Sequence, residues 1–256
     1  NEASSFSLII VPDTQVYSYN DPEWYRSSRK EVFTQMTRWI VANVEELNIK
    51  FVMHVGDIVQ EYDKDYQWAN ANEAMSKLDG VVPYSLVIGN HDMALDATRD
   101  TTNFNNTFPY TRYESMPWYG GRLVDDGYTP GNTYDNSYHF FSAAGMDFLV
   151  VALEMGPTDA VLAWANDIVS RYPNHRVIVT THSYLTKNNT RDSIGEHMAA
   201  SDSPSRSGEE VWQKFVKKHK NISFVFSGHF GHSDNHKGLL TSAGENGNTV
   251  HQLLNG

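Results

Sequence analysis

Short apolar runs alternate along the chain with segments whose apolar residues recur every three or four positions. The first pattern is typical of buried strands and the second of amphipathic helices. Five runs predict strands, at residues 6–11, 50–55, 84–88, 176–180 and 222–226. Four periodic segments predict helices, within residues 32–47, 68–78, 161–169 and 211–216. This alternation favours mainly parallel sheets with helices on their outer faces.

Two other parts of the chain depart from the alternation. NSYHFFSA and DFLVVALE, at residues 136–143 and 147–154, predict a hairpin that adds a second sheet. Residues 93–136 lack clear periodicity and are rich in aromatic residues. A segment of that length is usually functional or ordered by its own packing. We expect one domain over residues 1–256, since neither a repeat nor a low-complexity linker divides the chain.

The composition excludes several classes of function. The chain has 256 residues, with 20 basic against 31 acidic ones, a net charge of −11 and no cysteine. Thiolate metal sites and cysteine nucleophiles are therefore excluded, which leaves His, Asp, Glu, Asn and Gln as candidate ligands. The negative charge repels phosphate backbones, so long nucleic acid is not an expected partner. No run approaches the ~18 apolar residues of a membrane span.

Polar side chains that suit metal ions follow all five of these predicted strands. They are Asp13 with Gln15, Asp57, Asn90 with His91 and Asp92, His182, and His229. Because the carboxyl ends of parallel strands meet at one edge of a sheet, we expect these side chains to converge. A pair of divalent cations needs anionic oxygens, a carboxylate that can bridge, and neutral donors, and this set supplies all three. Such a pair activates water for attack on phosphorus.

The motifs DTQ, GD, GNHD, H and GH, in this order, resemble those of the calcineurin-like metallophosphoesterase family, over essentially the whole chain. PDTQ, PWYGG and SGEEVWQKFVKKH look like a bacterial subgroup that is often exported and often multidomain. The resemblance implies a four-layer α/β/β/α sandwich of two mixed sheets flanked by helices. It also implies a hydrolase of small-molecule or polymer phosphate esters, either a phosphatase or a phosphodiesterase.

The same resemblance implies the location and extent of the protein. We expect an exported protein, extracellular, periplasmic or on the cell surface, in its mature form, because NEASSF lacks the features of a signal peptide. We expect a monomer or weak oligomer that forms part of a larger multidomain chain. Residues 250–256, VHQLLNG, look like the middle of a family strand, so the domain is expected to be truncated at its C-terminus.

The resemblance assigns metal ligands position by position. Asp13 and Gln15 would bind the first metal, and Asp57 would bridge the two ions. The second metal would be held by Asn90, His182 and His229. Gln15 stands where the family usually has histidine, so the first site has oxygen ligands, which favours Mn, Fe, Mg or Ca. The second site is expected to hold Mn, Fe or Zn.

Two further departures from the family pattern concern the GD and GH motifs. Gln60 stands where an acid often helps to position the catalytic histidine, and Gly231 stands where a second histidine usually follows GH. His232, one residue later, is a candidate substitute ligand, whereas His236 is interpreted as a loop residue. We therefore hypothesise that the first metal binds weakly and that activity depends on added Mn or a similar ion.

The catalytic and substrate-binding roles also come from the resemblance. His91 would face the substrate, together with Asn90, and would stabilise the phosphate or protonate the leaving group. Asp92 would orient the His91 ring, as a carboxylate commonly does for a working imidazole. Trp118 and Tyr119 are candidates for lining a substrate cleft, or they simply pack the long loop.

Two other histidines and two other functions complete the expectations. His54 and His139 lie inside apolar strands and are predicted to be core histidines with hydrogen-bond partners. One alternative function is a catalytically silent family member that acts as a binding or surface module. The other is a metal-dependent hydrolase of a non-phosphate ester or a sulfate.

Overall fold

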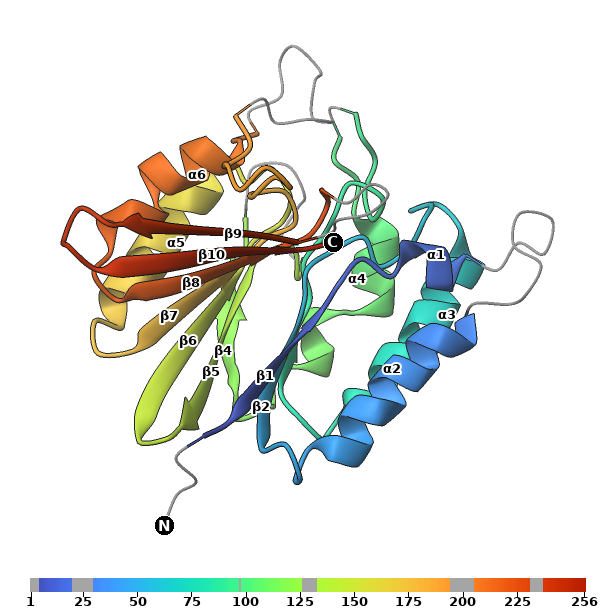
Figure 1. The fold of residues 1–256 in the computed structure, drawn as a ribbon. Helices are drawn as coiled ribbons and strands as arrows, with labels where there is room; N and C mark the ends of the chain where they lie inside the picture. Colours follow the sequence, from blue (N-terminus) through green and yellow to red (C-terminus); the bar gives the residue numbers. More distant parts are fainter. Residues whose placement is uncertain (1–4, 20–29, 97, 126–132, 194–204, 231–236) are drawn as a thin grey trace.

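Two β-sheets pack face to face, and helices cover the outer face of each sheet (Figure 1). The computed structural model describes residues 5–19, 30–96, 98–125, 133–193, 205–230 and 237–256. Three clusters of buried side chains fill the spaces between the four layers, one under each helical layer and one between the sheets. The predicted four-layer α/β/β/α sandwich is therefore confirmed.

The first sheet has the strand order β1-β2-β3. These strands are β1 (Ser7–Val11), β2 (Ile49–His54) and β3 (Tyr84–Ser85). The expectation of a mixed sheet is wrong for this part of the described chain, because β1–β2 and β2–β3 both pair in parallel. β3 is also shorter than the predicted run 84–88. Beyond β3 the chain stays buried but turns to the other sheet, where the Ile88 carbonyl accepts from the Met155 amide.

Helices α2 (Lys30–Asn43) and α3 (Asp65–Met75) cover the outer face of this sheet, and a short α1 (Gln15–Ser18) follows β1 (Figure 1). A 3-10 turn, Ser76–Leu78, extends α3. Both long helices bury apolar side chains against the strands. The buried face of α2 is centred on Phe33 and Ile40, however, whereas Val32 and Trp39, which the spacing placed on the buried stripe, are exposed. α2 begins two residues before its predicted range and ends four residues earlier than predicted.

The second sheet has the order β4-β5-β6-β7-β8-β10-β9. Its strands are β4 (Tyr119–Arg122), β5 (Ser137–Ala143), β6 (Met146–Ala152), β7 (Arg176–Thr180), β8 (Ile222–Ser227), β9 (Lys237–Ala243) and β10 (Thr249–Asn255). β6, β7, β8 and β10 run parallel, whereas β4–β5, β5–β6 and β9–β10 pair antiparallel. The predicted hairpin is confirmed as β5 and β6.

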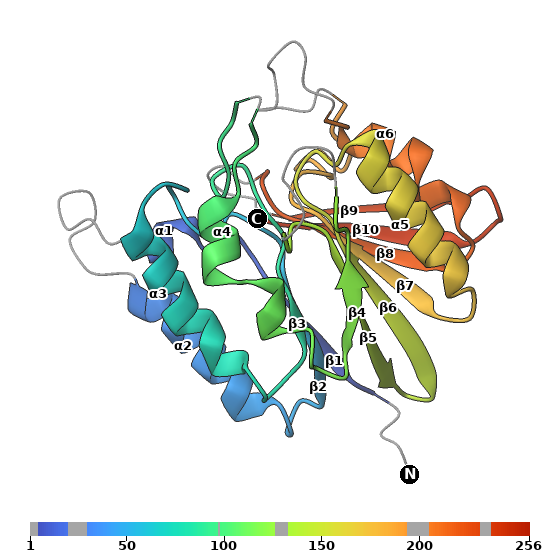
Figure 2. The ribbon, with the colours of Figure 1, turned by 180° about the vertical axis from the view of Figure 1, so that it is seen from behind.

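Helices α5 (Asp159–Arg171) and α6 (Gly208–Lys214) cover the outer face of the second sheet (Figure 2). A 3-10 turn, Val216–Lys218, follows α6. Ser207 caps α6 by accepting from the Glu210 amide, while the Glu210 carboxylate accepts from the Ser207 amide. This reciprocal pair satisfies two amides that would otherwise lack partners at the helix start. No helix in the described ranges is both long and apolar enough to cross a membrane.

The described parts of the aromatic segment 93–136, residues 93–96, 98–125 and 133–136, are ordered by the packing of their own rings. It contains α4 (Thr102–Thr107), a 3-10 turn (Tyr110–Arg112) and β4, and it buries several rings between α3 and the strands. The rings of Tyr113 and Tyr134 stack with centroids 4.6 Å apart, and Tyr84 packs edge-on against Tyr113. The segment therefore belongs to the hydrophobic core instead of forming a free loop.

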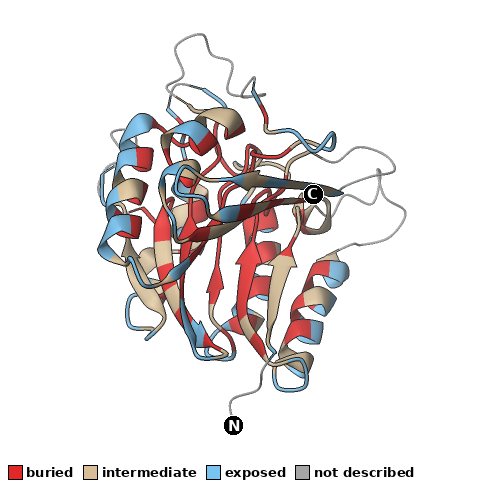
Figure 3. Cartoon of the chain, turned by 60° about the vertical axis from the view of Figure 1, so that its left-hand side comes forward, coloured by how far each residue is buried: buried red, intermediate tan, exposed pale blue. Residues whose placement is uncertain are grey.

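The carboxyl ends of β1, β2, β7 and β8 meet at one edge of the sandwich. The Val55 amide donates to the Val11 carbonyl in the first sheet, and the Gly228 amide donates to the His182 carbonyl in the second. Of the strands leading to this edge, β2 and β7 are largely buried, whereas most of β1 and part of β8 are of intermediate burial (Figure 3). Side chains that follow these four strands are thus held on a rigid frame.

Candidate metal centre

Three predicted ligands from three loops come together at this edge. Asp57, His182 and His229 each offer one ligand atom, and these atoms lie within 4.8 Å of one another. His182 Nε2 lies 3.1 Å from Asp57 Oδ2 without forming a hydrogen bond. His182 Nδ1 donates to the Val55 carbonyl at 2.7 Å. That backbone bond fixes the ring so that Nε2 faces the carboxylate, which is how proteins commonly orient a metal-binding imidazole.

Asp13 joins the same cluster through the loop after β1. Its carboxylate accepts from the His229 amide at 3.1 Å, and Oδ1 lies 4.0 Å from His182 Nδ1. Burial, reinforced by the nearby Asp57 charge, raises the pKa of Asp13 to about 7, although His182 opposes the shift. Two carboxylates close enough to affect each other's charge favour a bound cation, because each destabilises the charge of the other.

Burial and neighbouring charges shift the pKa values of His182 and Asp57 in opposite directions. Burial lowers the pKa of His182, but the charges of Asp57 and Asp13 outweigh it and raise that pKa to about 10. Burial raises the pKa of Asp57, yet the charge of His182 prevails and holds it below the ordinary value. The protein therefore places a positive charge between these carboxylates, which is the position that a divalent ion would take.

Buried atoms without partners support the metal assignment directly. Gln15 Oε1 and Asn90 Oδ1 are buried and have no hydrogen-bond partner among the described residues, and His182 Nε2 has only the Asp57 carboxylate, 3.1 Å away. Leaving such an atom unpaired costs about 1–3 kcal/mol. All three belong to predicted ligands from three different motifs, and a cation would satisfy each of them. Together with Asp13 and Asp57, these donors therefore have the chemistry of a divalent-cation site, and Asp57, His182 and His229 already lie together.

The glycines of the GD, GN and GH motifs make room for these ligands. A Cβ on Gly89 would lie 2.1 Å from Asp57 Oδ1, and a Cβ on Gly228 would lie 2.3 Å from Asp13 Oδ1. A Cβ on Gly56 would lie 2.7 Å from His182 Nδ1. Sequence reasoning treated these glycines only as parts of motifs. Their role is to let backbone pass against a ligand side chain, where any other residue collides.

Two of the ligands themselves adopt a conformation that non-glycine residues rarely take. Asp57 has a φ of 51° and His229 has a φ of 71°. This left-handed region costs about 1–3 kcal/mol and persists only where surrounding contacts enforce it. For Asp57 those contacts include the Thr14 amide, which donates to its carbonyl, and the His91 amide, which donates to Oδ1 at 3.0 Å. Such strain concentrates at functional sites.

The predicted orienting role of Asp92 is wrong. Its Oδ1 accepts from the amides of Ile58 and Val59, and its Oδ2 accepts from the Gly89 amide. The carboxylate is buried and these hydrogen bonds join the GD loop to the GN loop, so both of its oxygens are engaged away from the His91 ring. Burial raises the pKa of Asp92 to about 8, and the Asp57 charge adds to the shift. Asp92 therefore holds the two loops together.

The His91 ring is held instead by the loop after Asp57. Its Nδ1 donates to the Gln60 carbonyl at 2.7 Å, with the Gln60 side-chain amide 3.3 Å away. Nε2 is then the ring nitrogen available to a substrate. The Gln60 backbone carbonyl thus positions the His91 ring, a role that the resemblance assigns to an acidic side chain in other family members.

Gln67 of α3 holds the loop that carries the Gln60 carbonyl. Sequence reasoning missed this residue. Its side chain is fully buried, and Oε1 accepts from the amides of Gln60 at 2.8 Å and Glu61 at 2.9 Å. Its Nε2 donates to the Glu61 carboxylate and to the Tyr66 hydroxyl. No motif marks this residue, although a glutamine on the apolar face of a predicted helix was a usable signal.

Trp118 and Tyr119 do not line the site. The Trp118 ring lies among Phe51, Tyr84 and Tyr113, with centroids 6.0–6.5 Å apart, and both residues pack against the core under the first helical layer. The prediction of a substrate cleft is therefore corrected in favour of loop packing, because large rings gain more from burial between the layers. His232, His236 and Gly231 lie outside the described residues.

His54 and His139 are core histidines, as predicted. His54 Nε2 pairs with the Thr14 hydroxyl at 2.9 Å, and His139 Nε2 lies 3.0 Å from the Ser137 hydroxyl. Burial lowers the pKa of each to about 3, so both are neutral near pH 7.

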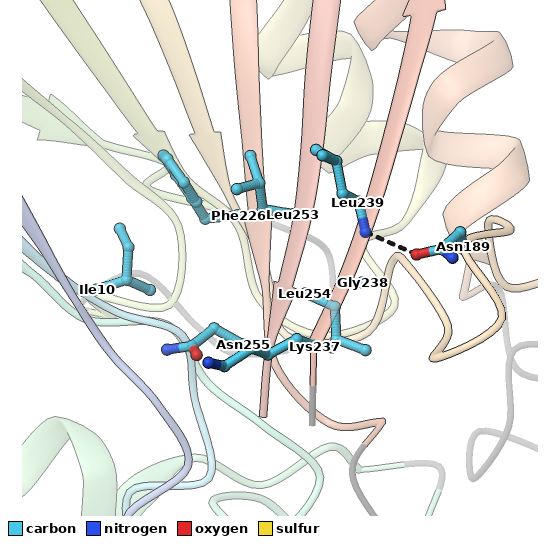
Figure 4. Close-up of a pocket in the computed structure, with 9 residues that line it drawn as sticks. All are labelled: Ile10, Asn189, Phe226, Lys237, Gly238, Leu239, Leu253, Leu254 and Asn255. Atoms are coloured by element: carbon cyan, nitrogen blue, oxygen red, sulfur yellow. Dashed lines mark hydrogen bonds between the residues drawn. The ribbon is translucent and has the colours of Figure 1, made fainter. Parts of the chain in front are cut away.

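Two cavities define the surroundings of the site. One has a volume of about 520 Å³. It lies between Ile10 of β1 and residues of β8, β9 and β10, including Phe226, Leu239 and Leu253 (Figure 4). None of its lining residues is a predicted ligand. The other, of about 300 Å³, is bounded by Asn90 and His91. Of these two, the second cavity therefore adjoins the metal centre.

Comparison with known proteins agrees with this geometry. Residues 6–232 match the model of the family described as calcineurin-like phosphoesterase. The chain is 30% identical over 254 residues to the uncharacterized protein YvnB of Bacillus subtilis, covering 96% of this chain and 18% of that protein. The chain thus spans under a fifth of that relative's length.

Solved structures share the fold at low sequence identity. A dimetal phosphatase from Danio rerio superposes with a TM-score of 0.54 and 14% identity, covering 100% of this chain and 88% of that one. A protein from Thermus thermophilus superposes with a TM-score of 0.50 and 12% identity, covering 96% and 87%. With the family match over nearly the whole chain and the ligand geometry described above, this protein belongs to the calcineurin-like phosphoesterase family.

Proposed function

We propose that this chain hydrolyses phosphate esters with two divalent cations held between Asp13, Gln15, Asp57, Asn90, His182 and His229. The family establishes metal-dependent phosphoester hydrolysis at a general level. The observation that carries the finer proposal is the pair of unpaired buried oxygens on Gln15 and Asn90, together with His182 Nε2 facing the buried Asp57 carboxylate and the partly exposed Asp13 carboxylate nearby. Both phosphomonoesters and phosphodiesters remain candidate substrates.

The two metal sites differ in ligand chemistry. Asp13 and Gln15 offer only oxygen atoms to the first, whereas two imidazoles serve the second. Oxygen ligands suit Mn, Mg or Ca, and imidazole suits Fe and Zn as well. The first site is therefore the weaker one, and added Mn supports activity by filling it.

The protein residues then have distinct tasks. When bound, the ions lower the pKa of water and offset the negative charge that develops at phosphorus. His91, held at Nδ1 by the Gln60 carbonyl, directs Nε2 at the ester and donates a proton to the departing alcohol oxygen. Asp57 holds the His91 backbone through its Oδ1, so the bridging ligand and the proton donor keep a constant separation.

Hydrolysis of two nitrophenyl esters tests the proposal. Metal-stripped protein is assayed on 4-nitrophenyl phosphate and bis(4-nitrophenyl) phosphate with Mn, Mg, Ca or Zn, alongside Asp57→Asn and His91→Asn. His251→Asn, which changes a histidine of β10 outside the site, serves as the matched control. We expect metal-dependent turnover that falls about a hundredfold or more in the two site variants and is kept in the control.

Absence of metal-dependent turnover would favour the alternative that the chain is a catalytically silent binding module. If no metal supports turnover above that of Asp57→Asn on either ester, the enzyme assignment fails. If a sulfate ester with the same leaving group is hydrolysed faster than the phosphate ester, the reaction class is wrong but the metal centre stands.

A further inference from the structure

The cavity beside His91 has a chemical character of its own. It has a volume of about 300 Å³ and is bounded by Asn90 and His91 on the side of the metal centre. The rest of its lining is Gln60, Glu61, Tyr62, Asp63, Met93 and Leu95. Since the proposed proton donor forms part of its wall, this cavity is where the alcohol part of a bound ester would lie.

Its charged lining is acidic. Glu61 and Asp63 both contribute, and neither Lys nor Arg is among the lining residues. Asp63 is half-exposed and paired with Lys64 at 3.0 Å. Glu61 makes no ion pair with any residue that the structure describes, and its carboxylate is held in place by the neutral Gln67 amide at 2.9 Å. Glu61 therefore brings to the cavity a negative charge that Lys64, already paired with Asp63, offsets only in part.

The remaining walls are apolar or aromatic. Met93 is fully buried, Leu95 is 51% exposed at the rim, and Tyr62 adds a phenol ring. A carboxylate beside an aromatic ring and thioether is a favourable environment for an organic cation, which gains from charge and from the face of the ring while its methyl or methylene groups lie on the apolar wall. An anionic alcohol finds neither Lys nor Arg there, and its charge is repelled by Glu61 and Asp63.

We propose that this cavity binds a positively charged amino alcohol, so that the substrates of the site are phosphate esters of amino or quaternary ammonium alcohols. This inference rests on the proposed function and specifies its substrate class. Glu61 and Tyr62 bind the cationic head, and His91 faces the ester oxygen between that head and phosphorus.

The step is an ordinary hydrolysis. The oxygen of water forms a bond to phosphorus, and the bond between phosphorus and the alcohol oxygen breaks with its electron pair on that oxygen. The attacking water gives up one proton to solvent, and the alcohol oxygen takes up one proton from His91, which regains a proton from solvent. No oxidant or reductant is needed, and the products are the free amino alcohol and a phosphate with one ester bond fewer.

Matched ligands that differ only in charge test the inference. Choline phosphate is compared with 3,3-dimethylbutyl phosphate, which replaces the ammonium nitrogen by carbon, by measuring the kcat/KM of phosphate release. Choline and 3,3-dimethylbutanol are compared as ligands of metal-free protein by titration calorimetry. Both comparisons are made in wild type, in Glu61→Gln, and in Glu46→Gln, which removes an equal charge from an exposed position outside the cavity.

We expect about a tenfold preference for the charged member in both measurements, reduced in Glu61→Gln and kept in Glu46→Gln. Equal binding of choline and its carbon analogue, or a preference that survives Glu61→Gln, overturns the inference. If nitrophenyl esters are hydrolysed without any preference for charge, the proposed function stands and the substrate class falls. If no ester is hydrolysed, the proposed function fails, and the binding titration still decides whether the cavity takes cations.

Discussion

Replacing Gln67 by methionine should slow catalysis, although Gln67 touches neither the substrate nor the metal ions. Gln67 Oε1 is the acceptor for the amides of Gln60 and Glu61, and the Gln60 carbonyl is the acceptor for His91 Nδ1. Methionine matches glutamine in length but accepts no strong hydrogen bond. Two partly buried amides then lose their acceptor, at about 1–2 kcal/mol each after allowance for water access.

This loss of free energy is expected to loosen the loop that carries the Gln60 carbonyl. The His91 ring, which donates to that carbonyl, should then shift with the loop. A displacement of about 1 Å at a catalytic group can cost roughly a hundredfold in rate. We therefore expect kcat for nitrophenyl ester hydrolysis to fall about ten- to a hundredfold while KM changes little. Gln67→Glu keeps an acceptor for both amides and should recover part of kcat, limited by repulsion from Glu61.

The assay is steady-state kinetics at saturating Mn, with thermal unfolding measured on the same samples. Gln213→Met, an exposed substitution of the same kind on α6, controls for the loss of a glutamine. The reasoning is refuted if Gln67→Met unfolds at a lower temperature but keeps the wild-type kcat. It is also refuted if Gln67→Glu is no better than Gln67→Met.

Three further outcomes follow from the site and the core. Gly89→Ala forces its Cβ against Asp57 Oδ1 and should abolish Mn binding in a calorimetric titration, whereas Gly80→Asn, at a turn with open space around it, should bind Mn as wild type does. The protein should lose stability as pH falls below about 6.5, because His139 takes up a proton near that pH in the unfolded chain but only near pH 3 in the folded protein. Urea unfolding should show that this group lowers the free energy of unfolding by up to about 1.4 kcal/mol per pH unit. His139→Gln should lack this contribution. Arg99→Met should destabilise the protein by about 3–5 kcal/mol in urea unfolding, since it removes the guanidinium that lies 2.8 Å from the buried Glu154 carboxylate. Adding Glu154→Gln to this variant should recover part of the lost stability.

Much of the fold and ligand set was accessible from sequence for a physical reason. Buried strands leave continuous apolar runs, and in parallel sheets their polar followers must meet at one edge. Asp57, His182 and His229 could therefore be grouped without coordinates, although 125 residues separate Asp57 from His182. The hairpin and the capped helix α6 were equally predictable, because their signals are local.

What could not be predicted depends on how loops pack against one another. Asp92 follows His91 in sequence, yet its Oδ1 accepts from the amides of another loop, and adjacency in sequence gave no warning of this. Trp118 could have lined a cleft or filled the core, and only the positions of Phe51 and Tyr113 decide between them. Gln67 acts through two backbone amides, which leave no mark in the sequence.

The central claim is that two divalent ions share Asp57 at this edge of the sandwich. Anomalous diffraction at the manganese edge, from crystals grown at saturating Mn, tests it most directly. We predict two peaks that both lie within ligand distance of Asp57, the weaker beside Asp13 and Gln15 and the stronger beside Asn90, His182 and His229. Absence of any peak at Asp57, or a single ion bound elsewhere on the protein, would contradict the account.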